Sequence, residues 1–160
     1  MEWKAIDAFE AVGTITRNSF AWSAQSESRE VTALTLWEDE ISDDGVTVVV
    51  DTFNSPSIDL WKGSPRNKTR IRHLLDVWNG DRTFRVVMLR AKDPLAHPRR
   101  TRMRWPDLRL TMTLQQFNPV TGEFCAVGRR TDGEAITTSD NVAATKYRPL
   151  FDYLSSREEN

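Results

Sequence analysis

The chain has 160 residues, of which 39% are apolar and 28% are charged, and its formal net charge at neutral pH is -1. These values are typical of a soluble globular protein, and no apolar run approaches the ~20 residues that a membrane-spanning helix needs. Because the N-terminus has no signal-peptide pattern and the single cysteine, Cys125, cannot form an internal disulfide, we expect a cytoplasmic protein with no membrane partner.

In the first half of the chain we expect one short helix and two strands. Residues 3–13 carry apolar side chains at helical spacing and end in Gly13, which predicts a short helix. The segments 30–41 and 46–53 have the composition of strands and flank an Asp44-Gly45 turn. They are therefore predicted to pair as a hairpin.

The central helix is the clearest element of the sequence. It is expected over 64–79, with Ser64 as the N-cap, Pro65 in the first helical position and Asn79-Gly80 as the stop. The spacing i, i+3, i+4, i+7 places four apolar side chains on one stripe: Ile71, Leu74, Leu75 and Trp78. The basic side chains of this helix then lie mainly toward solvent: Arg66, Lys68 and Arg70.

Further strands are expected over 82–91, 108–117 and 123–130, and a C-terminal helix over 147–154. In the second of these strands, Leu108 begins an alternating apolar series that continues to Leu114 and faces the core. The predicted fold class is α+β, with a curved, mainly antiparallel sheet or partly open barrel of five or more strands and two or three helices. It forms one domain over 1–155 with a frayed tail at 156–160.

Charge is distributed very unevenly along the chain. Residues 1–61 hold 3 basic and 12 acidic residues, whereas residues 62–109 hold 14 basic and 4 acidic residues, a net +10. The basic segment either pairs with the acidic first third inside the fold or forms a stripe for an anionic partner, most often a nucleic acid.

The strongest local concentration of positive charge is HPRRTRMRWP, residues 97–106. If this segment is extended, Arg100, Arg102 and Arg104 project to one side at intervals of about 6 to 7 Å, which matches successive phosphates of a nucleic-acid strand. Together with Arg99, these arginines are the candidate phosphate contacts, unless they pair internally with acidic residues.

Three tryptophans are candidates for contacts with bases. Trp22 lies in the polar segment RNSFAWSAQS, while Trp61 and Trp105 each lie beside a basic residue. Aromatic faces next to arginine suit base stacking, and the alternative is that each tryptophan covers the edge of the core.

An acidic run, WEDEISDD, suggests an alternative catalytic site. If the hairpin closes with a two-residue loop, Glu38 lies opposite Asp51 with Glu40 on the same face. Carboxylates on neighbouring strands are what a magnesium-dependent nuclease needs, because the metal offsets their repulsion and activates water. A longer turn would shift the register and leave these acids as solubilising residues.

The succession RNSFAWSAQS, LTLWEDEI, RIRHLLDVWNGDRTFRVVMLRAKDP and HPRR resembles the small N-terminal recognition modules attached to HNH nucleases in bacterial restriction-like proteins. The acidic turn WEDEISDDG also resembles turns of the SRA family of modified-base readers. The likeness covers roughly residues 15–105 and implies a curved sheet that receives a flipped or modified base in an aromatic pocket.

The sequence contains no zinc, nucleotide-binding or hydrolase motif, so no cofactor or metal is expected. The leading hypothesis is a nucleic-acid-binding module without catalysis of its own, with DNA favoured over RNA. The alternatives are the magnesium-dependent nuclease and a protein-interaction or small-ligand domain.

Overall fold

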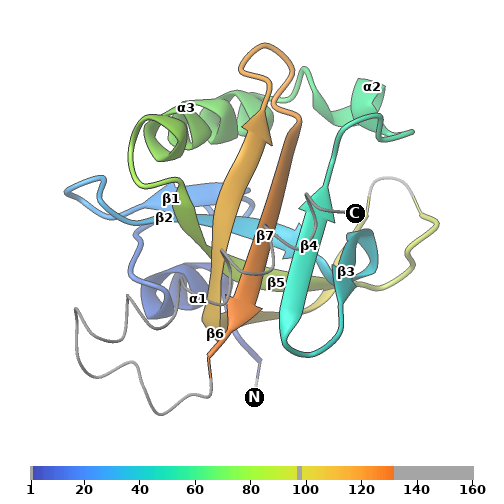
Figure 1. Ribbon diagram of the computed structural model, residues 1–160. Helices are drawn as coiled ribbons and strands as arrows, with labels where there is room; N and C mark the ends of the chain where they lie inside the picture. Colours follow the sequence, from blue (N-terminus) through green and yellow to red (C-terminus); the bar gives the residue numbers. More distant parts are fainter. Residues whose placement is uncertain (1, 97–98, 132–160) are drawn as a thin grey trace.

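The computed structural model describes residues 2–96 and 99–131 (Figure 1). The predicted helix over 147–154 and the predicted tail at 156–160 lie outside the described residues.

Seven strands form one curled sheet, in the order β1-β2-β5-β6-β7-β4-β3 (Figure 1). They are β1 (Ser23–Gln25), β2 (Thr32–Trp37), β3 (Ile41–Asp43), β4 (Thr47–Asp51), β5 (Thr83–Ala91), β6 (Thr101–Phe117) and β7 (Phe124–Arg130). The β2–β5 pairing is parallel and the other pairings of the sheet are antiparallel. The predicted fold class, an α+β protein with a curved and mainly antiparallel sheet, is confirmed.

The helices are α1 (Ala5–Ala11), α2 (Ile58–Trp61) and α3 (Pro65–Asn79), and a 3-10 turn, η1, spans Glu38–Glu40. The start of α3 is as predicted, because Ser64 Oγ accepts a hydrogen bond from the backbone N–H of Arg66. After α1 the chain turns at Gly13, whose φ of 91° favours glycine.

The two longer helices pack on opposite faces of the sheet. Leu74 and Val77 of α3 join the main apolar cluster on the concave face, which includes Val86 of β5. The next residue, Val87, belongs to a second cluster with Phe9 of α1. Because successive residues of a strand point to opposite faces, α3 and α1 lie on opposite sides of the sheet, as Figure 1 shows.

The predicted hairpin between 30–41 and 46–53 is wrong in extent. The segment 30–41 is interrupted by η1, so β2 pairs with β1 and, in parallel, with β5. A short remainder, β3, forms the hairpin with β4. Parallel pairing of β2 with β5 needs the long connection that α3 supplies, and a local turn signal such as Asp44-Gly45 carries no information about it.

Strand β6 is longer than predicted and contains two irregularities in its pairing with β5. Between the pairs Val87↔Pro106 and Arg85↔Thr111, β5 advances by two residues and β6 by five. This irregularity breaks the expected alternation of buried and exposed side chains along β6, and Leu108 is consequently 48% exposed instead of facing the core.

The buried face of α3 is rotated from the predicted stripe. Leu75 is 36% exposed, whereas Asn67 is fully buried and Val77 nearly so. Asn67, Arg70, Leu74 and Val77 follow one another at spacings of three or four residues, so Arg70 lies on the buried face. The prediction that Arg70 points mainly toward solvent is wrong.

Candidate functional site

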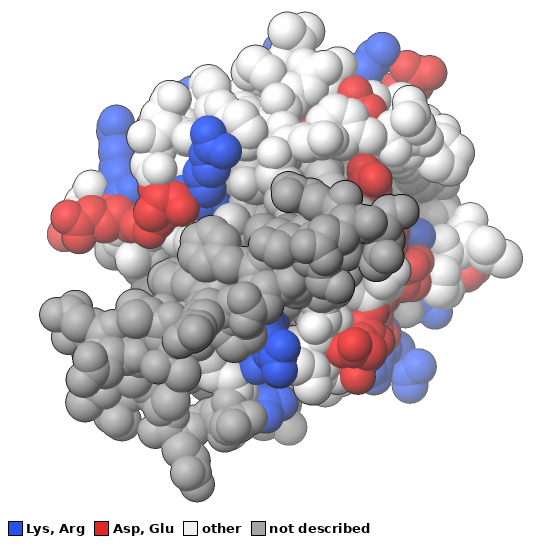
Figure 2. Space-filling model, in the orientation of Figure 1, with Lys and Arg blue, Asp and Glu red and all other residues white. Residues whose placement is uncertain are grey.

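Acidic residues of the first third pair with a subset of the arginines. Arg90 binds Glu38 through two hydrogen bonds, and Arg99 donates to both carboxylate oxygens of Asp39 at 2.8 and 2.7 Å. Arg99 also lies 3.4 Å from Glu40. On the face drawn in Figure 2, basic and acidic side chains lie next to one another at the left, the upper right and the lower right.

Arg99 is therefore an internal residue of the fold. Its side chain is 18% exposed, and its guanidinium lies 5.3 Å from the ring centre of Trp37. The two terminal nitrogens, Nη1 and Nη2, thus donate to the fold's own groups, Asp39 and the carbonyl of Pro94. Arg99 thus follows the alternative stated above, in which the arginines pair internally with acidic residues.

The row expected from Arg100, Arg102 and Arg104 is interrupted. Arg90 pairs with Met103 but Ala91 pairs with Thr101, so a bulge falls at Arg102. Arg102 and Arg104 lie on either side of Met103 and point to the same face of the sheet. The bulge reverses which face each residue before Thr101 points to, so Arg100 does not share the face of Arg102 and Arg104. No ion pair joins these three arginines to a carboxylate within 2–96 and 99–131.

Other arginines lie on the same face as Arg104. Arg104 pairs with Leu89, two residues beyond Val87, which packs under α1. Arg129 pairs with Thr111, which in turn pairs with Arg85, again two residues from Val87. Because paired side chains share a face, a basic face forms on the α1 side of the sheet. We define it by four residues: Arg85, Arg102, Arg104 and Arg129.

The acidic hairpin site predicted as an alternative does not assemble. Ile41 pairs with Val50, so the register differs from the one that would set Glu38 opposite Asp51. Glu38 and Glu40 lie in η1 and contact Arg90 and Arg99, while Asp51 ends β4. The described part of the chain holds no group of three or more acidic, histidine or cysteine side chains that could bind a metal ion.

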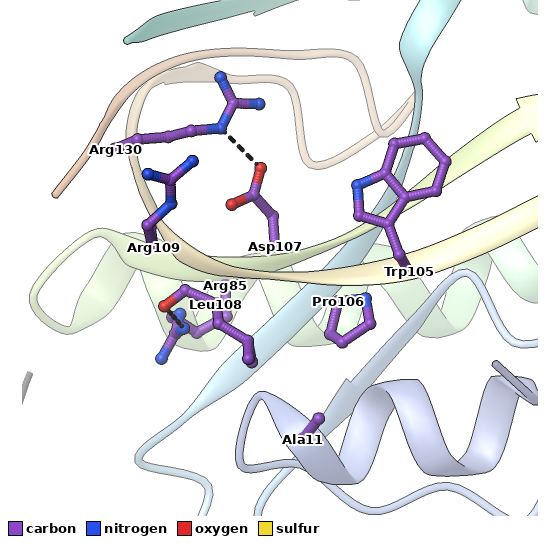
Figure 3. A pocket seen from close by; sticks show the side chains of 8 residues that line it. All are labelled: Ala11, Arg85, Trp105, Pro106, Asp107, Leu108, Arg109 and Arg130. Carbon is purple, nitrogen blue, oxygen red and sulfur yellow. Dashed lines mark hydrogen bonds and ion pairs between the residues drawn. The ribbon is translucent and has the colours of Figure 1, made fainter. Parts of the chain in front are cut away.

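The bulge of β6 borders an open hollow of about 760 Å³ (Figure 3). Arg85 fixes the bulge by donating to the carbonyls of Leu108 and Leu110 at 2.9 and 3.1 Å. Asp107 accepts from Arg130 at 2.8 Å, and Figure 3 shows Arg109 projecting on the same side of β6. Trp105 also lines this hollow, packs against the main cluster and carries the Arg90 guanidinium 5.4 Å from its ring centre.

Trp22 and Trp61 meet at a different place, around Arg70 of α3. The Arg70 guanidinium carbon lies 5.1 Å from the ring centre of Trp22, 5.2 Å from that of Trp61 and 5.5 Å from that of Phe124. Phe124 is fully buried, whereas both tryptophans are half-buried. We call Arg70 and these three rings the arginine cage.

The arginine cage is held by the fully buried Asn67. Asn67 Nδ2 donates to the carbonyls of Lys62 and Thr121, both at 2.9 Å, and its Oδ1 accepts from Arg70 Nη2 at 2.9 Å. Asn67 thereby ties the end of α2, the start of α3 and the β6–β7 turn together. Burial lowers the pKa of Arg70 to about 10, and Glu40 opposes this shift through its negative charge.

No known protein family, curated protein or solved structure matches this chain. Within the described residues, no helix has the length and apolar character needed to cross a membrane.

Arg70 and Asn67 are the residues that sequence reasoning missed. The sequence contained a sign of their position, because both residues lie at helical spacing from Leu74 and therefore on the same face of α3 as Leu74. The apolar stripe through Leu75 is equally regular and was therefore predicted to be the buried one, but Leu75 lies at the surface.

Proposed function

We propose that this protein is a cytoplasmic nucleic-acid-binding module, with DNA favoured over RNA, and that the basic face on the α1 side of the sheet contacts the phosphates. The proposal rests on one observation. Arg90, Arg99 and Arg130 form ion pairs with carboxylates, whereas Arg102 and Arg104 have no carboxylate partner among the residues described.

The arrangement suits a repeating anion. Side chains two residues apart on a strand are separated by about 6 to 7 Å, and β7 places Arg129 on the same face as Arg104. Arg85 adds its positive charge to this face, while its Nε and Nη2 donate to the carbonyls of the β6 bulge. Clustered arginines of this kind bind polyanions by displacing condensed counterions.

The test is fluorescence anisotropy with labelled duplex DNA, in EDTA and over a series of salt concentrations. Arg102→Ala combined with Arg104→Ala should weaken binding and lower the slope of log affinity against log salt by about two. The matched control, Lys68→Ala with Arg72→Ala, removes two exposed charges of α3 and should leave the slope close to that of the parent protein. Equal affinity and slope in the β6 variant would refute the proposal.

Two further arms refine the partner. Single-stranded DNA and RNA of the same sequence test the preference for DNA. Paired duplexes with and without methylated cytosine test base reading, which the sequence resemblance implies and which would depend on the tryptophans. Magnesium-dependent loss of the labelled strand would instead support the nuclease alternative.

A further inference from the structure

The arginine cage contains a cation, Arg70, that no carboxylate of the described residues binds directly. Among the described residues, Arg70 makes one hydrogen bond, to the neutral amide of Asn67, and its buried Nε has no acceptor. The Nη1 group likewise has no hydrogen-bond acceptor within the described chain. Taking a cation out of water without pairing it costs free energy, and contacts with aromatic faces recover only part of that cost.

The nearest acidic residue does not complete the site. Glu40 acts on Arg70 through its charge, but it forms its ion pair with Arg99, at 3.4 Å. Burial raises the pKa of Glu40, while Arg99 and Arg70 oppose that shift. Within the described residues, Glu40 therefore pairs with Arg99 and accepts no hydrogen bond from the guanidinium of Arg70.

The surroundings of Arg70 combine positive charge with aromatic surface. Arg66 lies one helical turn before it and places its guanidinium 5.3 Å from the ring centre of Phe20, which is 67% exposed. Trp22 and Trp61 keep part of their surfaces accessible. A ligand at this end of α3 would meet two guanidinium groups and flat apolar walls.

We propose that the arginine cage is a binding site for an organic oxyanion, a carboxylate or phosphate group carried on an aromatic or apolar body. The oxyanion accepts hydrogen bonds from Nη1 of Arg70, and the body of the ligand packs against Trp22 and Trp61. The ligand would supply the negative charge that the fold withholds from Arg70. This site is separate from the basic face, since Phe124 belongs to the main apolar cluster on the α3 side of the sheet, whereas the basic face lies on the α1 side.

The experiment titrates the full chain with benzoate and with phenyl phosphate, using acetate and inorganic phosphate as the bare ions. Binding is followed by the ¹⁵N side-chain resonance of Arg70 Nε and by tryptophan fluorescence. We expect saturable changes in both signals, with the aryl ligands binding more tightly than the bare ions. The stronger of the two aryl ligands identifies whether the natural group is a carboxylate or a phosphate.

Two variants and one control test the assignment. Arg70→Gln should weaken aryl-oxyanion binding by about tenfold or more, because a charged hydrogen bond and the ion pair are lost. The control Arg72→Gln changes an exposed arginine of the same helix and should bind normally. Should Arg70→Gln fail to fold, Glu40→Gln decides, since it removes a competing carboxylate outside the cage and should tighten binding.

Four results would overturn the proposal. The first three are no saturable change at Arg70 Nε in the parent protein, unchanged affinity in Arg70→Gln, and unchanged affinity in Glu40→Gln. The fourth is equal binding of bare and aryl ions, which would remove the role of the tryptophans. The variant Arg102→Ala with Arg104→Ala should retain oxyanion binding, so failure of the nucleic-acid proposal is distinguishable from failure of this one.

Discussion

Replacing Asn67 with alanine removes three hydrogen bonds from a fully buried position. The two bonds to the carbonyls of Lys62 and Thr121 are each worth about 1 kcal/mol, and the bond from the charged Arg70 guanidinium is worth about 1.5 to 3 kcal/mol. The free energy of unfolding should therefore fall by about 3.5 to 5 kcal/mol. For a chain of this length, about 2 to 4 °C per kcal/mol, that loss lowers the melting temperature by roughly 7 to 20 °C.

The assay is urea and thermal unfolding followed by circular dichroism and tryptophan fluorescence. Asn79→Ala is the matched control, because Asn79 is an exposed residue at the end of the same helix. It should change the free energy of unfolding by no more than about 0.5 kcal/mol. If Asn67→Ala lowers the free energy of unfolding as little as Asn79→Ala does, then Asn67 does not hold α2, α3 and the β6–β7 turn together. In that case Asn67 does not hold the arginine cage in place.

Three more variants probe other parts of the fold. Burial lowers the pKa of His73 in the folded protein, because it disfavours the charged imidazole. The free energy of unfolding that the neutral imidazole contributes is therefore complete above pH 6.5 and is lost as the pH falls through the lower folded-state pKa. His73→Asn should flatten this part of the curve of stability against pH. Arg130→Met leaves two carboxylates unpaired and should cost about 2 to 4 kcal/mol in urea unfolding, whereas Arg129→Met, at an exposed neighbour, should cost little. Gly128→Ala would place a Cβ 2.4 Å from Met112 Sδ and 2.5 Å from a backbone oxygen. This overpacking should lower the free energy of unfolding by about 1 to 3 kcal/mol, and with it the melting temperature. An unchanged melting temperature would contradict the tight packing of β6 against β7.

Local signals in the sequence determined the elements that depend on neighbouring residues. Ser64 and Pro65 start α3 and Asn79 ends it, because capping and the fixed φ of proline act within one turn. The short apolar runs of β5 and β7, 86–89 and 124–127, likewise indicate those strands. These patterns, with several short strands and few helices, were sufficient for the α+β class and the curved, mainly antiparallel sheet.

Charge could be located from the sequence but its partners could not. The clustering of arginine at 99–104 was evident, yet only the fold decides that Arg99 is bound by Asp39 while Arg102 and Arg104 have no such partner within the described residues. An ion pair between residues sixty positions apart depends on where two strands end, and composition carries no record of that. The same holds for Glu38, because the 3-10 turn places it beside Arg90 and not opposite Asp51 as predicted.

The arginine cage was decided entirely by tertiary structure. Trp22, Trp61 and Phe124 come from three separate parts of the chain and meet because β1, α2 and β7 surround one face of α3. Two helical stripes of similar quality ran along α3, and its rotation was set by which stripe the curled sheet could bury. That choice depends on the parallel β2–β5 pairing and the bulges of β6, which are long-range contacts that no local pattern specifies.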